Sequence, residues 1–255
     1  MSTIDRLEQI QELLKKDNRI TLLDISEKFN ISIATARRDL DLLAEHGKVQ
    51  RIRGGAILVG KAPPELPVLQ RAQEQTEEKQ RIGAAAAALV HEGDSVFIGN
   101  GSTAFEVAKN LTKLKNITVI TNSLLVQNAL ANYLDISLVI MGGYFRNTEY
   151  AVYGHITEYD LSQVHVNKVI IGIRAINIEE GLSNDFLFFP EVSTDRAIIK
   201  SGKEVIIVAD HTKFNRISTA IISPISCVNK IITDNKVPPD TLNEFRDLGI
   251  DVIVA

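Results

Sequence analysis

Arginine side chains are concentrated in two adjoining stretches of the sequence, between residues 32 and 56. Residues 32 to 46 read SIATARRDLDLLAEH, and residues 48 to 56 read KVQRIRGGA. A helical projection of the first stretch predicts a core-facing side formed by Ile33, Ala36, Leu40, Leu43 and Ala44. The same projection turns Arg38 away from that side and leaves Arg37 on its flank. Both arginines are therefore predicted to reach the surface.

Arginines in this arrangement could bind DNA. In a helix-turn-helix, the amino-terminal part of the second helix enters the major groove, where one arginine can bond two acceptors of a guanine. Arg51 and Arg53 lie two residues apart on the extended stretch that follows, so they project to one side and could grip phosphates or the minor groove. The predicted DNA contacts are Ser32, Ala34, Thr35, Arg37, Arg38, Arg51 and Arg53.

The alternative is a solvated helix face, on which the arginines pair with Asp39, Asp41 and Glu45. Residues 1 to 60 contain 10 Lys and Arg against 9 Asp and Glu, so net charge does not distinguish the two interpretations. The whole chain has a formal charge of -4, which excludes a protein that is basic throughout. The helix spacing and the basic extended stretch favour DNA binding.

A second stretch resembles a dinucleotide-binding turn. Residues 97 to 111 read FIGNGSTAFEVAKNL, in which Gly99, Gly101 and Ala104 match the spacing of that pattern. The pattern requires an acidic residue about 20 positions further on, after the next strand. Asn122 and Ser123 stand there instead, so no nicotinamide cofactor, and no other cofactor, is predicted.

The same turn suits a phosphate. Its backbone amides and the hydroxyls of Ser102 and Thr103 would lie at a helix amino terminus, where an anion is stabilised. The alternative is an ordinary strand-to-helix turn that a serine or threonine caps. Either way, the stretch must lie between a strand and a helix.

Polar loops also follow three other apolar runs: Asn122-Ser123 after ITVIT, Gly142-Gly143 with Arg146 after ISLVIM, and Asp210 to Lys213 after EVIIVA. The carboxyl ends of parallel strands meet at one edge of a sheet, where ligands bind such folds. A pocket is therefore predicted there. Amides, hydroxyls, Arg146 and Lys213 would suit a small phosphorylated polyol.

The elements that position these residues follow from apolar periodicity. Helical patterns fill the first 46 residues, and Gly54-Gly55 separates two extended stretches as in a β-hairpin. Pro63, Pro64 and Pro67 then end regular structure. The sequence predicts a winged helix-turn-helix over residues 1–60, a linker over 61–73 and an effector-binding and oligomerisation domain over 74–255.

The remaining chain has the pattern of an α/β domain. Short β-branched runs alternate with helical stretches, and they read DSVFI, ITVIT, ISLVI, NKVIIGI, KEVIIVA, NKIITD and DVIVA. Such continuous apolar runs predict a mostly parallel sheet with helices on both faces.

Composition excludes several classes of protein. The single cysteine, Cys227, cannot form an internal disulfide, and no Cys/His cluster has the spacing of a metal site. The amino terminus has no apolar signal core, and no apolar run approaches the ~20 residues of a membrane span. We therefore expect a cytoplasmic protein without a metal or a membrane anchor.

Residues 6 to 56 resemble the winged helix-turn-helix of bacterial DeoR-family transcription regulators. The shared pattern consists of Arg6, the stretch 35–40, Gly47 and the stretch 54–56. Ala36 stands where the family commonly has isoleucine, a conservative change on the core side. The later loops resemble the family's effector domain, so the resemblance covers nearly the whole chain.

The resemblance implies a fold similar to ribose-phosphate isomerase in the second domain, and a DNA-binding repressor of carbohydrate genes that a phosphorylated sugar controls. It implies double-stranded operator DNA as a partner and a homo-oligomer, a dimer or a tetramer, on repeated half-sites. By motif, the implied effector contacts are Asn100, Gly101, Ser102, Thr103, Asn122, Ser123, Gly142, Gly143 and Lys213.

Two rival functions stay open. A sugar-phosphate isomerase with a DNA-binding appendage would need a base that moves a proton at carbon. In the resembling isomerases acidic residues follow the central strand, whereas Arg174 and Ala175 stand there in this sequence. Asp185, Glu191 and Asp210 remain as acids with ordinary structural roles, so no catalytic residue is predicted. The second rival is an oligomerisation scaffold without a ligand.

Overall fold

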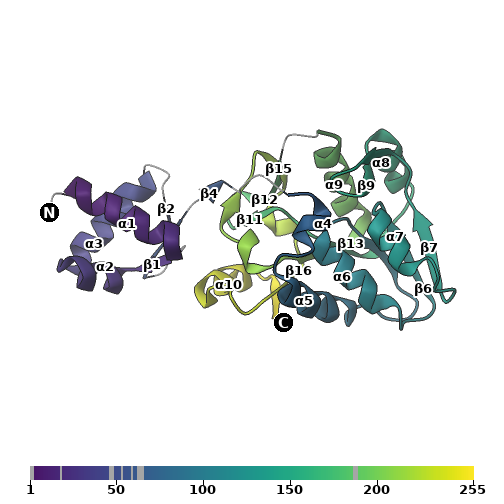
Figure 1. Cartoon of the computed structure of the whole chain (residues 1–255), viewed down its shortest axis with the longest axis horizontal. Coiled ribbons are helices and arrows are strands. Elements are labelled where there is room, and N and C mark those ends of the chain that lie inside the picture. The colour runs from purple at the N-terminus through teal and green to yellow at the C-terminus, as the bar shows by residue number, and fades with distance from the viewer. Residues whose placement is uncertain are drawn as a thin grey trace. The chain divides into compact units, whose positions relative to one another are not determined.

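The computed structural model describes residues 3–17, 19–45, 49–52, 54–58, 60–61, 66–185 and 189–255. Its contacts divide the chain into one unit over Met1–Lys61 and a second over Ala62–Ala255 (Figure 1). Because the placement of the two units relative to each other is not determined, each is described by itself.

The first unit is a helix-turn-helix with a small antiparallel sheet. Its elements are α1 (Thr3–Asp17), β1 (Arg19–Thr21), α2 (Leu22–Phe29), α3 (Ile33–Glu45), β2 (Val49–Ile52), β3 (Gly55–Leu58) and β4 (Gly60–Lys61). Thr21 caps α2, because its hydroxyl accepts from the Asp24 amide while the Asp24 carboxylate accepts from the Thr21 amide. Asn30 ends α2 in the left-handed conformation, with φ 50°, and so makes the turn into α3.

Helix α3 buries most of its predicted core face. Ala36, Leu40 and Leu43 are buried, but Ile33 is 44% exposed, so the prediction was wrong at that residue. Ile33 begins the helix, and Ile31 of the preceding turn packs against the core of this unit instead. The amino-terminal turn of α3 therefore stands further out of the core than the projection implied.

The basic extended stretch forms the predicted hairpin. Strands β2 and β3 pair around Gly54, whose φ of 84° lies in the left-handed region that favours glycine. Gly55 lies so close to the neighbouring strand that a Cβ there would be 2.2 Å from the carbonyl oxygen of Ile20. That neighbour, β1, adds a third strand, which the sequence did not predict because only three residues form it.

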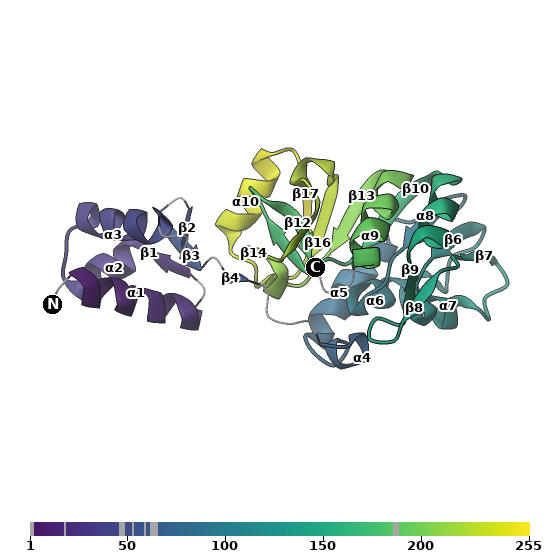
Figure 2. The same cartoon turned by 90° about the horizontal axis from the view of Figure 1, so that it is seen from above.

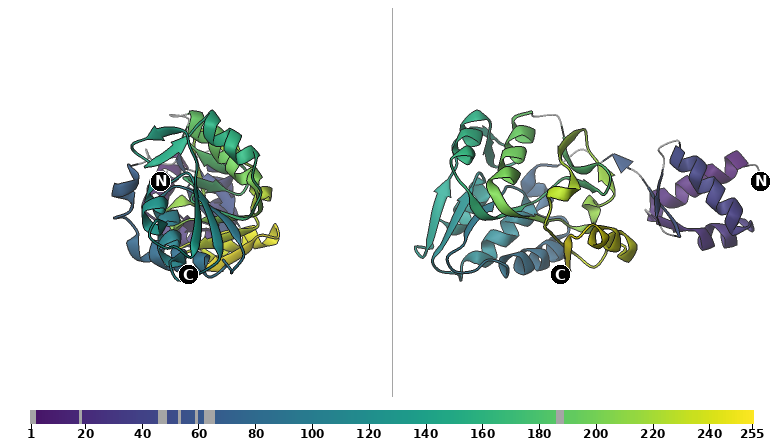
Figure 3. Two further views of the ribbon diagram at one scale, coloured as in Figure 1. Left: turned by 90° about the vertical axis from the view of Figure 1, so that its right-hand side faces the viewer. Right: turned by 180° about the vertical axis from the view of Figure 1, so that it is seen from behind.

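The second unit is built on a parallel seven-stranded sheet, as predicted. Its order is β17-β16-β13-β10-β5-β6-β7. All of the β-branched runs named above lie in it, as β5 (Ser95–Ile98), β6 (Ile117–Thr121), β7 (Ile136–Ile140), β10 (Val166–Ile171), β13 (Gly202–Val208), β16 (Lys230–Thr233) and β17 (Asp251–Val254). Figures 2 and 3 show these strands between layers of helices.

Side chains that alternate along the strands pack into two separate hydrophobic cores. Val96 and Ile98 pack with helices α5 (Thr76–Ala87), α6 (Ser102–Leu111) and α7 (Leu124–Leu130). Phe97, which lies between them, packs with α8 (His155–Ser162), α9 (Phe189–Ser201) and α10 (Pro239–Asp247). The sheet is therefore covered on both faces, which explains why its strands read as continuous apolar runs.

Smaller elements complete the second unit. An antiparallel sheet consists of β11 (Ala175–Asn177), β12 (Gly181–Asn184) and β15 (Ala220–Ser223), and a hairpin consists of β8 (Tyr144–Arg146) and β9 (Ala151–Tyr153). The remaining short elements are β14 (Arg216–Ile217), η1 (His211–Lys213) and η2 (Ile225–Cys227). The sequence did not predict these short elements.

The predicted linker is too long at its carboxyl end. Residues 66 to 73 belong to the second unit and contain the short helix α4 (Val68–Arg71). Val68 is fully buried, and its amide donates to the Thr148 carbonyl at 2.8 Å. Pro67 precedes the helix, where the missing amide hydrogen of proline has no cost.

Candidate functional site

The first candidate site is the outer face of α3. Ser32, Ala34, Arg37 and Arg38 are exposed and Thr35 is half-buried. The Ser32 hydroxyl accepts from the Thr35 amide at 3.1 Å, so it caps the helix. Of the predicted DNA contacts, these residues lie together at the amino-terminal part of the helix.

The carboxylates near α3 are engaged elsewhere. Asp39 is buried and accepts from Arg6 Nε at 2.6 Å and from Arg6 Nη2 at 3.0 Å. The hydrogen bond with Asp39 raises the pKa of Arg6, although burial opposes the shift. Arg37 and Arg38 form no ion pair with the described residues. Among those residues, the ion pairs that the solvated-face alternative proposed are therefore absent for these two arginines, whose side chains lie in solvent.

Arg51 differs from the arginines of α3. Its Nε lies 2.9 Å from Asp41 Oδ1, and its Nη1 donates to the Gly55 carbonyl at 3.0 Å. These contacts tie the wing to α3, so Arg51 has a structural partner as the alternative proposed. Arg53 lies outside the described residues, and its predicted role stays a prediction.

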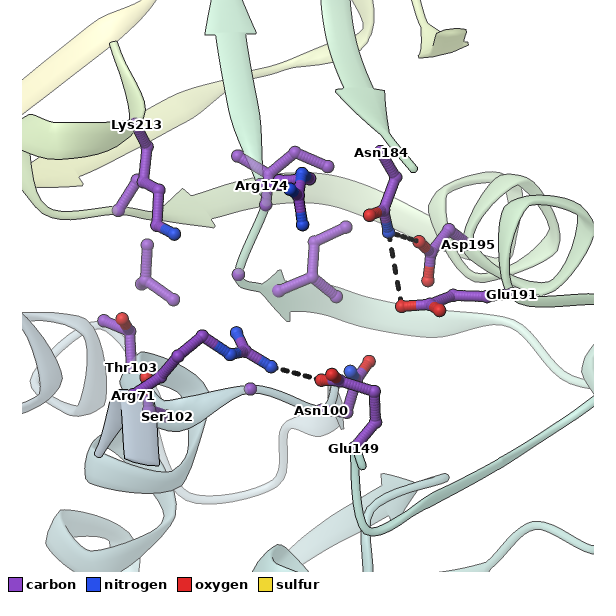
Figure 4. Close-up of a pocket in the computed structure, with 16 residues that line it drawn as sticks. Arg71, Asn100, Ser102, Thr103, Glu149, Arg174, Asn184, Glu191, Asp195 and Lys213 are labelled. Carbon is purple, nitrogen blue, oxygen red and sulfur yellow. Dashed lines mark hydrogen bonds and ion pairs between the residues drawn. The ribbon is translucent and has the colours of Figure 1, made fainter. Parts of the chain in front are cut away.

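The second candidate site is a pocket at the carboxyl ends of β5, β10 and β13, which are neighbours in the sheet. The pocket encloses about 550 Å³ of empty space, part of it open to solvent. Of the predicted effector contacts, it is lined by Asn100, Gly101, Ser102, Thr103 and Lys213. In Figure 4, Lys213 extends into the pocket from the side opposite Ser102 and Thr103.

The turn before α6 has the features of an anion-binding helix amino terminus. Gly101 precedes the helix with φ 108°, in the region that favours glycine, and the buried Ser102 and Thr103 are its first residues. The first amides of any α-helix have no partner within the helix, and the helix dipole adds a partial positive charge there. The ammonium of Lys213 adds a full charge at the same pocket.

Five predicted effector contacts do not line this pocket: Asn122, Ser123, Gly142, Gly143 and Arg146. Their loops follow β6 and β7, which lie one and two strands beyond β5, away from β10. The prediction that all the polar loops converge was therefore wrong, because strand order decides which loops meet.

Those five residues have other contacts. Asn122 is fully buried and its Nδ2 donates to the Val152 carbonyl at 3.0 Å, while Ser123 caps α7.

Gly142 accepts from the Thr157 hydroxyl at 2.5 Å, and a Cβ on Gly143 would lie 2.4 Å from that hydroxyl oxygen. Arg146 forms an ion pair with Glu191, so it supports a residue of the pocket wall.

The rest of the wall was not predicted as an effector site. The loop after β10 contributes Ile171, Gly172, Ile173 and Arg174, and other elements contribute Arg71, Glu149, Asn184, Glu191, Asp195, Val208 and Ala209. The sequence could have indicated that the loop after β10 lines the pocket, because β10 lies at the centre of the sheet. The other polar residues come from α4, the β8–β9 turn, β12 and α9, whose places in space cannot be deduced from spacing along the chain.

The arginines of the pocket are paired before any ligand arrives. Arg71 forms an ion pair with Glu149, and Arg174 Nη2 lies 3.1 Å from Asp185 Oδ2. The side chains of Arg71 and Arg174 are only 13% and 3% exposed. Because a buried unpaired charge is costly, these carboxylates are what allow the guanidinium groups to stay there.

One corner of the pocket is acidic. Asn184 Nδ2 donates to Glu191 Oε1 at 3.3 Å and to Asp195 Oδ2 at 3.1 Å (Figure 4). Glu191, for which the sequence predicted an ordinary structural role, is thus part of the pocket wall. Oxygen-rich corners of this kind accept hydrogen bonds from hydroxyl or amino groups.

Lys79 holds the segment that carries Arg71 through hydrogen bonds to its main chain. The buried Lys79 ammonium donates to the main-chain oxygens of Arg71 at 2.5 Å and of Glu74 at 2.6 Å. Burial lowers the pKa of Lys79, and the nearby Asp210 opposes that shift. Arg71 also donates from Nε to the Leu66 carbonyl at 2.9 Å, so its orientation is fixed on two sides.

Within the described residues, no group of three or more His, Cys, Asp or Glu side chains could hold a metal ion. No helix in the described part of the chain is long and apolar enough to cross a bilayer.

Comparisons with known proteins assign both units. Residues 6–62 match the DeoR-like helix-turn-helix domain, and residues 74–235 match the DeoR C terminal sensor domain. The chain is 35% identical to the transcriptional repressor AccR of Agrobacterium fabrum, over 92% of this chain and 90% of the relative. It is 33% identical to the glycerol-3-phosphate regulon repressor of Escherichia coli K12, over 99% of both chains.

Among solved structures, ribose 5-phosphate isomerase A of Methanocaldococcus jannaschii is similar, with a TM-score of 0.39 and 19% identity over 55% of each chain. A likeness of this size carries no argument about activity. The two domain matches and the identity to full-length repressors decide the classification. The chain therefore belongs to the DeoR family of DNA-binding transcriptional regulators.

Proposed function

We propose that the first unit binds an operator through the outer face of α3, and that a phosphorylated sugar or polyol in the pocket changes this binding. The turn at Gly101 to Thr103 is the observation that supports this class of ligand, because the turn and Lys213 line the same pocket. The name of the glycerol-3-phosphate regulon repressor refers to a phosphorylated polyol, which supports the same class for this chain.

On the DNA side, the exposed Arg38 contacts base edges and Arg37 contacts the phosphate backbone. One winged unit covers a single half-site, so the operator requires two or more copies of the chain. Oligomers of this kind are symmetric, and the operator therefore contains repeated half-sites. The protein acts as a repressor that the ligand releases, as the names of its relatives suggest.

Inside the pocket, the ligand places its phosphate at α6 and its hydroxyl groups toward the acidic corner. Glu191 and Asp195 accept hydrogen bonds from those hydroxyls, and Asn184 orients both carboxylates. A second anionic group in that corner would meet the carboxylates of Glu191 and Asp195, which repel it. A neutral sugar or polyol phosphate is therefore favoured over a phosphorylated sugar acid.

Arg71 links the pocket to the rest of the chain. It lines the pocket, yet it lies only ten residues after Lys61, the end of the first unit. A ligand phosphate that draws Arg71 away from Glu149 shifts the segment that Lys79 and Leu66 hold. Such a ligand binds the free and the DNA-bound states with different affinity, which is the condition for control.

The experiment is a thermal-unfolding screen of the full chain. The panel contains phosphorylated sugars and polyols, their unphosphorylated counterparts, phosphorylated sugar acids and inorganic phosphate. A ligand at 100 times its dissociation constant adds about 2.7 kcal/mol to the free energy of unfolding. We expect one neutral sugar or polyol phosphate to raise the midpoint, and neither its unphosphorylated counterpart nor inorganic phosphate to match it.

Two variants make the screen specific for the pocket. Ser102→Glu puts a carboxylate where the phosphate binds and abolishes the shift, whereas Ser226→Glu, on the exposed face of η2, preserves it. If no compound of the panel shifts the midpoint of the parent, or if both variants respond equally, the pocket is not the effector site.

An isomerase remains the second candidate, because Glu191 and Asp195 line the pocket and a carboxylate can move a proton at carbon. Incubation of the protein with aldose and ketose phosphates separates the two functions. Regulation predicts no interconversion. Turnover that disappears in Glu191→Gln would establish the enzyme instead.

A further inference from the structure

Exposed apolar side chains gather around one end of the second unit. We call this surface the β7 patch, and its residues are 38% to 67% exposed: Val139, Ile140, Tyr144, Phe145, Tyr150, Ile156 and Tyr159. Some members of the patch are neighbours in space. A Cβ on Gly142 would lie 3.3 Å from Ile156, and Tyr144 and Ile156 line one groove with Pro190.

Strand β7 forms the edge of the sheet at this patch (Figure 1). Among the described residues, β6 is the only strand that pairs with it. Its sequence, ISLVI, contains no charge and no proline. Edge strands of soluble proteins usually carry such residues, because an apolar edge can pair with another chain.

The other edge of the same sheet is protected. Strand β17 reads DVIV, and Asp251 at its start lies 2.7 Å from the Lys230 ammonium of the neighbouring strand. One sheet thus has a charged edge and an uncharged edge. The difference indicates that β7, and not β17, is covered in the assembled protein.

The patch is large enough for a dimer interface. An aromatic side chain can bury roughly 150–250 Å², so the exposed fractions correspond to on the order of 600 Å² for the patch. That lies at the upper end of the roughly 300–600 Å² of the largest apolar patch on a typical monomer, and it approaches the ~800 Å² per partner of a standard interface. Main-chain groups of the edge strand add to this area.

A second copy of this chain is the partner that the strand fits. An antiparallel pair centred on Leu138 places Ile136 opposite Ile140 and Ser137 opposite Val139 of the other copy. No charges meet in this register, and each copy offers the same surface, as a two-fold axis requires. The aromatic residues of the patch then flank the joined strands.

We propose that two copies of the chain dimerise through antiparallel pairing of β7, with the β7 patch as the interface. The inference deepens the oligomeric part of the proposed function, since the dimer supplies two winged units for two half-sites. It does not depend on the ligand or on the contacts of α3 with DNA. Unchanged masses in the glutamate variants would refute this interface and leave the proposed function standing, whereas a monomeric parent would contradict both. A ligand screen without any response would leave the interface standing.

The first test is sedimentation equilibrium of the full chain at micromolar concentrations. We expect the parent to have the mass of two chains or a multiple of it. Ile140→Glu and Tyr144→Glu should halve that mass or raise the dissociation constant at least tenfold, because a buried carboxylate would face its own copy. Val254→Glu, a matched change at 43% exposure on β17, should leave the mass unchanged.

Two controls and a cross-link complete the test. Circular dichroism establishes that the variants fold, and Tyr144→Glu, outside β7, keeps the sheet intact if Ile140→Glu does not. In a Cys227→Ser background, Leu138→Cys should form an oxidised covalent dimer, since directly opposed residues meet disulfide geometry. A monomeric parent, unchanged masses in both glutamate variants, or no cross-link would each overturn the proposal.

Discussion

The arginines of α3 and the arginines of the pocket have opposite surroundings. Arg37 and Arg38 are exposed and form no ion pair with the described residues. Arg71 and Arg174 are largely buried, and each is paired with a carboxylate. An exposed charge is already solvated, so it is available to the dense phosphates of DNA. A buried one must be neutralised in advance, so a ligand gains only the difference between its own contact and the carboxylate it replaces.

Whether an arginine is paired depends on its burial and not on the unit to which it belongs. Arg6 belongs to the DNA-binding unit, yet it is buried and its guanidinium forms two hydrogen bonds to Asp39. The Arg6–Asp39 pair is therefore a buried ion pair of the same kind as the two pairs in the pocket. The comparison predicts a large cost when a buried pair is broken and a small one when an exposed charge is removed.

The largest expected effect follows from Asp39→Ala. The change leaves the Arg6 charge buried without its partner, which typically costs about 3–5 kcal/mol. Urea unfolding of the full chain, monitored on the transition of the first unit, measures this loss. Asp41→Ala is the control, because Asp41 is 51% exposed and its pair with Arg51 contributes about 0–1 kcal/mol. Equal losses in the two variants would contradict the distinction.

Arg38→Ala should have the next largest effect, on operator binding and not on stability. Loss of a bidentate contact to a base typically costs about 1–3 kcal/mol and relaxes the preference at that base pair. Fluorescence anisotropy with a duplex that the protein selects from random sequence measures both quantities. An unchanged affinity and an unchanged base preference would remove Arg38 from the interface.

Arg71→Gln should separate ligand control from operator binding. The variant leaves Glu149 buried without its partner, so it should be less stable than the parent. It keeps the exposed arginines of α3, so at temperatures where it is folded we expect parental operator affinity without ligand. Its response to the sugar phosphate should fall, because typical coupling is about 1–3 kcal/mol and Arg71 lies on the proposed route. Arg81→Gln, an exposed residue of α5 outside the pocket, is the matched control. A full response in Arg71→Gln would exclude that route.

The smallest effect is expected for Arg51→Ala. Asp41 and the Gly55 carbonyl already hold this guanidinium, so a phosphate contact would first have to release it. We expect a loss of operator affinity smaller than for Arg38→Ala and similar for all sequences. A larger or sequence-dependent loss in the same anisotropy titration would show that Arg51 reads bases.

Local sequence patterns predicted most elements of the fold. The seven sheet strands were recognisable because both faces of the sheet are covered, so each strand is a continuous apolar run. Thr21 and Ser32 cap their helices through equally local contacts, since each hydroxyl bonds an amide three residues on. Short strands such as β1 and β8 leave no pattern that is long enough to detect.

The sequence predicted only those parts of the pocket that a single loop forms. Gly101 to Thr103 form a strand-to-helix turn that can be read from spacing, and Lys213 follows a strand next to β10. Asn122 and Gly142 were assigned to the pocket because strand order is not written in the sequence. Glu149 and Asp195 were missed because they reach the pocket only through the packing of the hairpin and α9.

Operator binding with and without ligand tests the central claim most directly. The full chain is titrated onto the selected duplex, alone and with the sugar or polyol phosphate that raises its unfolding midpoint. The account predicts that this compound changes the operator affinity about fivefold or more, and that its unphosphorylated counterpart does not. The same operator affinity in the presence and absence of every stabilising sugar phosphate would contradict it.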